Sequence, residues 1–154
     1  MRNSFITLAL AGLAGLLMSM AAPAAQAQTF AVIVNAENNF TGDENTKRTQ
    51  IKRLYLKEQT AWPGGVESIP FGREAGSPEQ VAFEKSVLAM SNSEIESHWL
   101  KLKQIRGETP PRGIGSVRIL ARQVGKKPGA FGVVLASEAA TIDGAKVLFE
   151  FTAN

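Results

Sequence analysis

The clearest chemical signal in the sequence is a segment where a strand-like run gives way to a helix-like one. In Phe71-Gly72-Arg73-Glu74-Ala75-Gly76-Ser77-Pro78, an arginine, a glycine and a serine stand directly before an amphipathic pattern that begins at Pro78. The first N–H groups of a helix lack intrahelical acceptors, and the helix dipole favours negative charge there. Arg73, Gly76 and Ser77 are therefore the candidate ligand-binding residues for an anion.

The same segment also fits a helix start that satisfies its own polar groups. Ser77 and Gln80 have capping-box spacing, which would occupy the hydroxyl that a ligand would use. Glu79 in the first turn complements the helix dipole and would repel a nearby anion. Arg73 is able to pair with Glu74 or Glu79. Both interpretations, an anion site and a self-capped helix start, stay open at this point.

Composition narrows the chemistry that the chain can perform. It has 154 residues, of which 44% are hydrophobic and 20% charged, as expected for one globular domain. The absence of cysteine excludes disulfides, thiolate metal sites and a cysteine nucleophile. His98 is the only histidine, and no carboxylates are paired at an informative spacing. We therefore expect a protein that is not an enzyme and that uses no metal or cofactor.

The N-terminus has the pattern of a targeting segment. Arg2 supplies a positive start, residues 5–18 are apolar, and Ala25-Gln26-Ala27 fits the small-x-small cleavage pattern. The apolar run is too short to span a bilayer and no second one follows. The sequence predicts a signal peptide over residues 1–27, export to a bacterial periplasm, and a single mature domain over 28–154 that is not embedded in the membrane.

The charge balance gives no reason to expect a nucleic-acid partner. Arg2 is the sole charge in residues 1–27, so its removal changes 17 basic residues to 16 against 14 acidic ones, a net charge of +2. Residues 101–127 contain eight Lys and Arg against one acid, Glu108. Because these bases fall on at least two predicted helices and a loop, we expect a solvated surface rather than a binding face.

Hydrophobic periodicity predicts eight elements in the order strand, helix, strand, three helices and two strands. Their expected bounds are 29–35, 46–56, 66–71, 78–90, a helix with its capping box at 91–94, a helix from 116 to 127, 130–135 and 147–151. Segments 109–115 and 136–144 are predicted to be loops. Continuous apolar strands that alternate with helices favour an α/β fold with a largely parallel or mixed sheet.

Several stretches together resemble one lobe of the type II periplasmic binding proteins, specifically the phosphate-binding component of phosphate ABC importers. Ala31-Val32-Ile33-Val34-Asn35 is similar to the family's crossing strand, and Ile51 to Leu56 followed by Trp62-Pro63-Gly64-Gly65 resembles its short helix and turn. Arg73-Glu74-Ala75-Gly76-Ser77 resembles the phosphate loop, and Pro128-Gly129-Ala130-Phe131-Gly132-Val133 resembles the returning segment. The resemblance implies one lobe of a type II periplasmic-binding-protein-like fold, a mixed sheet flanked by helices.

The sequence departs from this family in two respects. The family binds phosphate between two lobes, whereas this length supplies one, and an aspartate of the other lobe that takes a proton from the ligand has no match. In the loop, Pro78 and Glu79 stand where the family has glycine and threonine. Pro78 suits the first helical position but offers no N–H to a ligand.

Two functions follow from the resemblance. The first is a periplasmic protein that binds phosphate or a similar oxyanion through Arg73, Gly76 and Ser77, with a second subunit or a membrane transporter component as a further partner. The second is an accessory or protein-interaction module in which the same lobe has lost its ligand, as the replacements Pro78 and Glu79 would allow.

Overall fold

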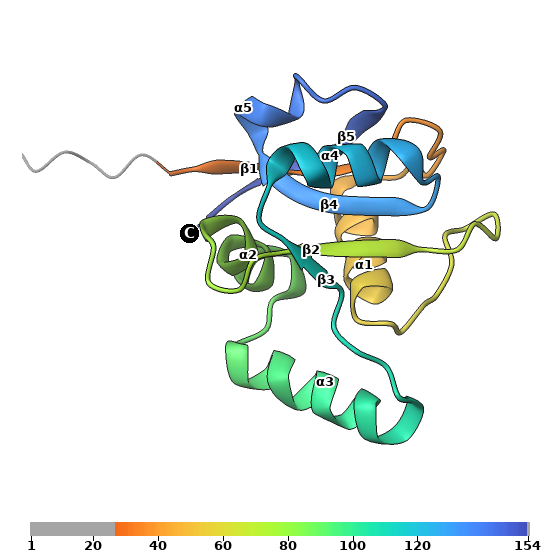
Figure 1. Cartoon of the computed structure of the whole chain (residues 1–154), viewed down its shortest axis with the longest axis vertical. Coiled ribbons are helices and arrows are strands. Elements are labelled where there is room, and N and C mark those ends of the chain that lie inside the picture. The colour runs from red at the N-terminus through yellow and green to blue at the C-terminus, as the bar shows by residue number, and fades with distance from the viewer. Residues whose placement is uncertain (1–26, 154) are drawn as a thin grey trace, which may run out of the picture.

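The computed structural model describes residues 27–153, and the predicted signal peptide lies outside them except for its last residue. Within this range the chain forms one five-stranded sheet in the order β3-β2-β4-β1-β5 (Figure 1). The strands are β1 (Thr29–Asn35), β2 (Ile69–Arg73), β3 (Arg112–Ile114), β4 (Ala130–Leu135) and β5 (Ala145–Thr152). β1 runs antiparallel to β4 and β5, and β2 runs parallel to β3 and β4. The predicted α/β fold with a mixed sheet is confirmed.

The central strand β1 is buried on both faces, as its unbroken apolar sequence predicted. Phe30, Val32 and Val34 belong to the core on one face of the sheet. Ala31 and Ile33 belong to the core on the other face. All five side chains are at most 1% exposed. Since successive side chains of a strand point to opposite faces, a strand with layers on both sides needs apolar residues throughout.

Helices cover both faces of the sheet. They are α1 (Glu44–Tyr55), α2 (Pro78–Phe83), a π-helical segment η1 (Glu84–Leu88), α3 (Asn92–Arg106), α4 (Val117–Lys126) and α5 (Ala136–Ala139). Residues of α1, α2, η1 and α3 join the core on one face, and residues of α4 and α5 join the core on the other. Figure 1 shows α3 farther from the sheet than the other helices.

Local polar contacts fix the helix starts. At α3 the Ser91 hydroxyl accepts from the Glu94 N–H at 3.3 Å, and the Glu94 carboxylate accepts from the Ser91 N–H at 2.7 Å. The capping box predicted there is confirmed. α1 begins two residues before its predicted start at residue 46, because the Asp43 carboxylate accepts from the Thr46 N–H at 2.7 Å and caps the helix.

Other predicted element bounds were also wrong. The helix expected over 78–90 changes to π-helical geometry after Phe83 and ends at Leu88. The loop expected over 109–115 contains β3, whose backbone pairs with the free edge of β2, and the loop expected over 136–144 contains α5. The strand expected over 66–71 begins at Ile69, where pairing with β4 begins, and continues to Arg73.

Candidate functional site

The candidate anion segment lies where β2 ends and α2 begins. β2 carries Arg73 at its last position, opposite Ile114 of the parallel strand β3. The chain then turns through Gly76, whose φ of 79° lies in the left-handed region that favours glycine. Ser77 is the N-cap of α2, and its hydroxyl accepts from the Gln80 N–H at 3.3 Å. The topology therefore brings the three predicted residues into one junction.

The Arg73 side chain is only 5% exposed and is held from three sides. Its Nη1 donates to the Ile114 carbonyl at 2.9 Å, and its Nη2 donates to the Gly115 carbonyl at 3.1 Å. Nη2 also lies 3.5 Å from Oε1 of Glu79, at the long limit for a hydrogen bond. Within residues 27–153, its Nε has no hydrogen-bond partner. The arginine is thus paired with an acid, as one of the two sequence interpretations had it, yet one edge of its guanidinium is weakly satisfied.

The predicted capping box at Ser77 is half right. The Ser77 hydroxyl accepts from Gln80 as expected. The Gln80 side chain does not return to the Ser77 N–H; its Oε1 accepts from the Arg73 N–H at 2.8 Å. The Ser77 N–H donates instead to the Glu74 carbonyl at 3.0 Å. The binding role of Arg73, Gly76 and Ser77 stays a prediction.

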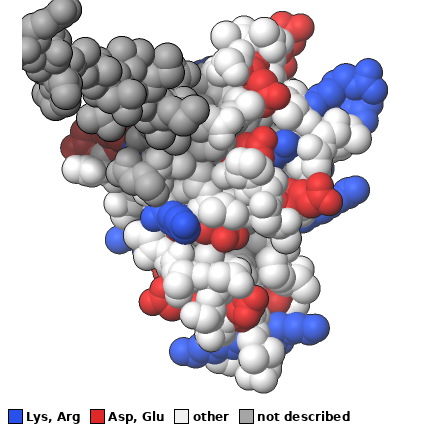
Figure 2. All heavy atoms as spheres, turned by 90° about the vertical axis from the view of Figure 1, so that its left-hand side faces the viewer, with Lys and Arg blue, Asp and Glu red and all other residues white. Residues whose placement is uncertain are grey.

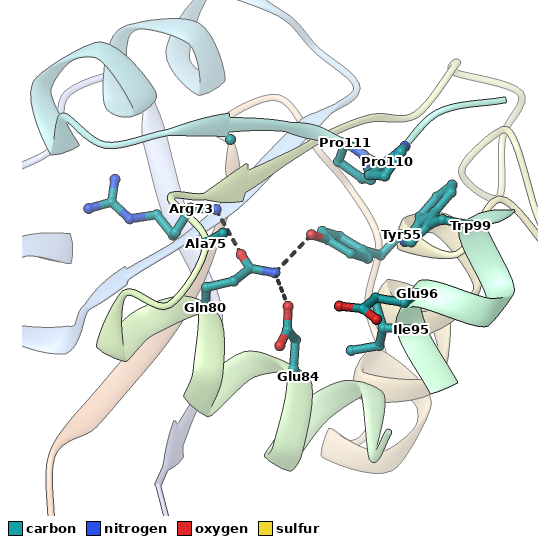
Figure 3. Close-up of a pocket in the computed structure, with 11 residues that line it drawn as sticks. Tyr55, Arg73, Ala75, Gln80, Glu84, Ile95, Glu96, Trp99, Pro110 and Pro111 are labelled. Carbon is teal, nitrogen blue, oxygen red and sulfur yellow. Dashed lines mark hydrogen bonds between the residues drawn. The ribbon is translucent and has the colours of Figure 1, made fainter. Parts of the chain in front are cut away.

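Gln80 is the centre of a buried hydrogen-bond network that the sequence did not reveal (Figure 3). Its Nε2 donates to the Tyr55 hydroxyl at 3.1 Å and to Oε1 of Glu84 at 2.8 Å. The three side chains come from α1, α2 and η1, so the network joins these elements to the end of β2. The only sequence signal was the spacing of Gln80 and Glu84, which places them on one face of a helix.

A cavity of about 440 Å³ opens beside this network. Its lining is formed by Tyr55, Arg73, Ala75, Gln80, Glu84, Ile95, Glu96, Trp99, Pro110, Pro111 and Gly113. Burial raises the pKa of Tyr55 to about 12; the hydrogen bond from Gln80 opposes this shift and the charge of Glu84 adds to it. The phenol is therefore neutral at physiological pH.

Trp62 and His98 make structural contacts in this fold, and the basic segment 101–127 lies on the surface. Trp62 is 4% exposed, and its indole N–H donates to the Gly129 carbonyl at 2.9 Å. His98, the only histidine of the sequence, contacts the Leu56 carbonyl through Nε2 at 2.8 Å. The basic residues between 101 and 127 are all exposed. They are spread over α3, β3, α4 and the residue after it.

Three further features of residues 27–153 concern the surface charge, groups that could hold a metal ion, and membrane-spanning helices. On the face in Figure 2, acidic and basic side chains are interspersed and form no large area of one sign. Among residues 27–153, no group of three or more His, Cys, Asp or Glu side chains is placed to hold a metal ion. No helix in the same part of the chain is long and apolar enough to cross a membrane.

The fold is similar to those of solved phosphate receptors. The chain matches an ABC-type phosphate transport receptor from Vibrio cholerae with a TM-score of 0.57 and 18% identity, over 79% of this chain and 45% of the receptor. It matches PstS from Borrelia burgdorferi with a TM-score of 0.56 and 13% identity, over 79% and 47% of the two chains. A possible phosphate binding protein from Planctomyces limnophilus DSM 3776 gives a TM-score of 0.51 and 13% identity, over 79% and 40%.

No protein-family model matches this chain, and no curated protein matches its sequence. The chain spans less than half the length of each solved receptor that it resembles. At these identities the likeness concerns the fold alone. The predicted fold, an α/β lobe with a mixed sheet flanked by helices, is thereby confirmed, and so is its resemblance to the folds of solved phosphate transport and phosphate-binding proteins.

Proposed function

We propose that this chain is an exported binding protein that holds phosphate or a similar oxyanion at Arg73, with Gly76 and Ser77 lining the approach. Residues 1–27 act as a cleaved signal peptide, residues 28–154 form the mature domain, and the mature protein is periplasmic. The fold shared with phosphate receptors supports a solute-binding role. The proposal includes the identity of the ligand. It also includes a transporter component or a second subunit as the partner that receives this ligand.

The observation that carries the proposal is the state of the Arg73 guanidinium. Nε and Nη2 form one edge of its planar fork, the edge that matches two oxygens of a tetrahedral oxyanion. On this edge Nε has no partner within the described residues, and Nη2 meets Glu79 at 3.5 Å. An oxyanion that displaced the Glu79 carboxylate would accept from both nitrogens, away from bulk water. Glu79 is then a competitor for the site, and its own charge weakens ligand binding.

A second function, an accessory or interaction module without a small ligand, is favoured by two other observations. The Ile114 and Gly115 carbonyls already accept from both terminal nitrogens of Arg73, which reduces what an oxyanion would gain. On α3, Leu100 and Ile105 are 59% and 66% exposed, so this helix carries apolar side chains that a partner protein would cover.

Isothermal calorimetry with phosphate and with sulfate separates the two functions. Removing the carboxylate in Glu79→Gln should tighten phosphate binding about tenfold, because a like charge no longer faces the ligand. Glu74→Gln is the matched control: it removes the same charge from the same segment, but Glu74 lies beyond 4.0 Å of any cationic nitrogen in the described chain. No heat from either protein up to about 10 mM ligand would favour the interaction module, whereas equal affinities for the two variants would contradict the role of Glu79 as a competitor.

A further inference from the structure

The cavity beside Gln80 differs chemically from the Arg73 edge. Its walls carry the apolar and aromatic surfaces of Tyr55, Ile95 and Trp99, and its volume of about 440 Å³ falls within the range of small-molecule sites. Figure 3 shows two carboxylates directed into the space between η1 and α3: Glu84 from η1 and Glu96 from α3. Two of the three charged residues on its lining are therefore acidic.

These two carboxylates have no cationic partner. Glu84 accepts a hydrogen bond from the Gln80 amide at 2.8 Å, and Glu96 accepts one from the Asn92 amide at 3.0 Å. Within residues 27–153, neither forms a salt bridge with Lys, Arg or His. Arg73 is the only basic residue in the lining, and its guanidinium points away from the cavity toward Ile114, Gly115 and Glu79 (Figure 3). Glu84 is half-buried and Glu96 is exposed, so the cavity lining carries two carboxylates without a salt-bridge partner in the described residues.

The buried side chains of Gln80 and Tyr55 beside the cavity are hydrogen-bonded to one another. Gln80 is 7% exposed and uses its amide nitrogen for Tyr55 and Glu84 and its amide oxygen for the Arg73 N–H. Tyr55 is 4% exposed, and in the described chain its hydroxyl has one partner, the donor Gln80. The network holds Glu84 in place and leaves its second oxygen without a bond in the same range of residues.

We propose that this cavity binds a small organic cation, an ammonium or guanidinium group carried on an apolar body. The cationic group lies between Glu84 and Glu96, and the apolar body lies against Trp99 and the prolines of the opposite wall. Aromatic faces attract cations and aliphatic chains alike, and opposite charges in a partly dry cavity attract more strongly than in water. An oxyanion is excluded from this cavity by the same carboxylates, so the site is separate from the Arg73 edge.

The probes are phenethylammonium and the neutral phenethyl alcohol, which has nearly the same shape. Binding is followed by the indole N–H resonance of Trp99 in two-dimensional NMR. The only other tryptophan, Trp62, lines a different hollow and donates to Gly129, so its resonance serves as an internal reference. Phenethylammonium should shift the Trp99 resonance to saturation, and the alcohol should bind at least about tenfold more weakly, since it lacks the charge.

Variants assign the binding to the two carboxylates. Glu84→Gln/Glu96→Gln should weaken phenethylammonium binding at least about tenfold, because each amide keeps the size and one acceptor oxygen of the carboxylate but carries no charge. Glu58→Gln, an exposed acid outside the cavity lining, should leave the affinity unchanged. The proposal is overturned if the alcohol binds as tightly as the ammonium, if the double variant matches wild type, or if Trp99 does not respond up to about 10 mM probe.

Discussion

Replacing Gln80 by leucine tests whether the buried network holds this side of the fold together. The substitution removes three hydrogen bonds, to the Arg73 N–H at 2.8 Å, the Tyr55 hydroxyl at 3.1 Å and the Glu84 carboxylate at 2.8 Å. The Arg73 N–H is buried and would be left without an acceptor, which costs about 1–3 kcal/mol. Loss of the Tyr55 bond adds about 1 kcal/mol, and Glu84 is partly solvated and adds little. We expect a total loss of about 3 kcal/mol.

That loss is large against the whole stability of a small domain, which is about 5–15 kcal/mol. With a denaturant slope of about 1–3 kcal/mol per molar urea, the unfolding midpoint should fall by about 1–3 M. The assay is urea unfolding at neutral pH, followed by circular dichroism and tryptophan fluorescence. Gln104→Leu makes the same chemical change at an exposed position of α3 and should alter stability by less than about 0.5 kcal/mol. A Gln80→Leu midpoint within the error of the Gln104→Leu midpoint would refute the reasoning.

Three further results are expected from the same fold. Gly129→Ala should destabilise by about 3 kcal/mol or more in thermal melts, because its Cβ would lie 1.7 Å from the Glu67 carbonyl oxygen; an unchanged melting temperature would contradict this packing. The only tyrosine, Tyr55, has a folded pKa of about 12, raised by burial above its ordinary value of about 10, so stability is complete below pH 10 and falls by up to about 3 kcal/mol as the pH rises to 12. Urea midpoints at several alkaline pH values measure the decline, and Tyr55→Phe should remove this part of it. Ser91→Ala removes the capping hydroxyl of α3 and should cost about 1 kcal/mol by urea unfolding, whereas an unaltered midpoint would mean that the box contributes nothing.

The parts of the fold that were predictable are those determined by local pattern. The unbroken apolar run 29–35 predicted a strand covered on both faces, and the spacing of Ser91 and Glu94 predicted a capped helix start, because neither depends on what the rest of the chain does. β3 could not be found in this way. Its three residues follow two prolines and form a strand only because β2 offers them a free edge.

The side-chain contacts of the site were likewise predictable only where they depend on local sequence. The sequence placed Arg73, Gly76 and Ser77 at one junction, and the structure has them there. The partners of the guanidinium are carbonyls 41 and 42 residues away, and no local pattern specifies such contacts. Gln80 was expected to close a capping box, but bonding the buried Arg73 N–H satisfies a group that water cannot reach, which outweighs a cap exposed to solvent.

The central claim, that an oxyanion binds the Nε–Nη2 edge of Arg73, is tested most directly at the Arg73 Nε–H itself. This hydrogen has no acceptor within residues 27–153, so its NMR resonance reports the arrival of one. Titration with phosphate should move the resonance downfield to saturation in the wild type, at lower phosphate concentration in Glu79→Gln. A resonance that stays in place in both proteins up to about 10 mM phosphate, while the chain remains folded, would contradict the claim.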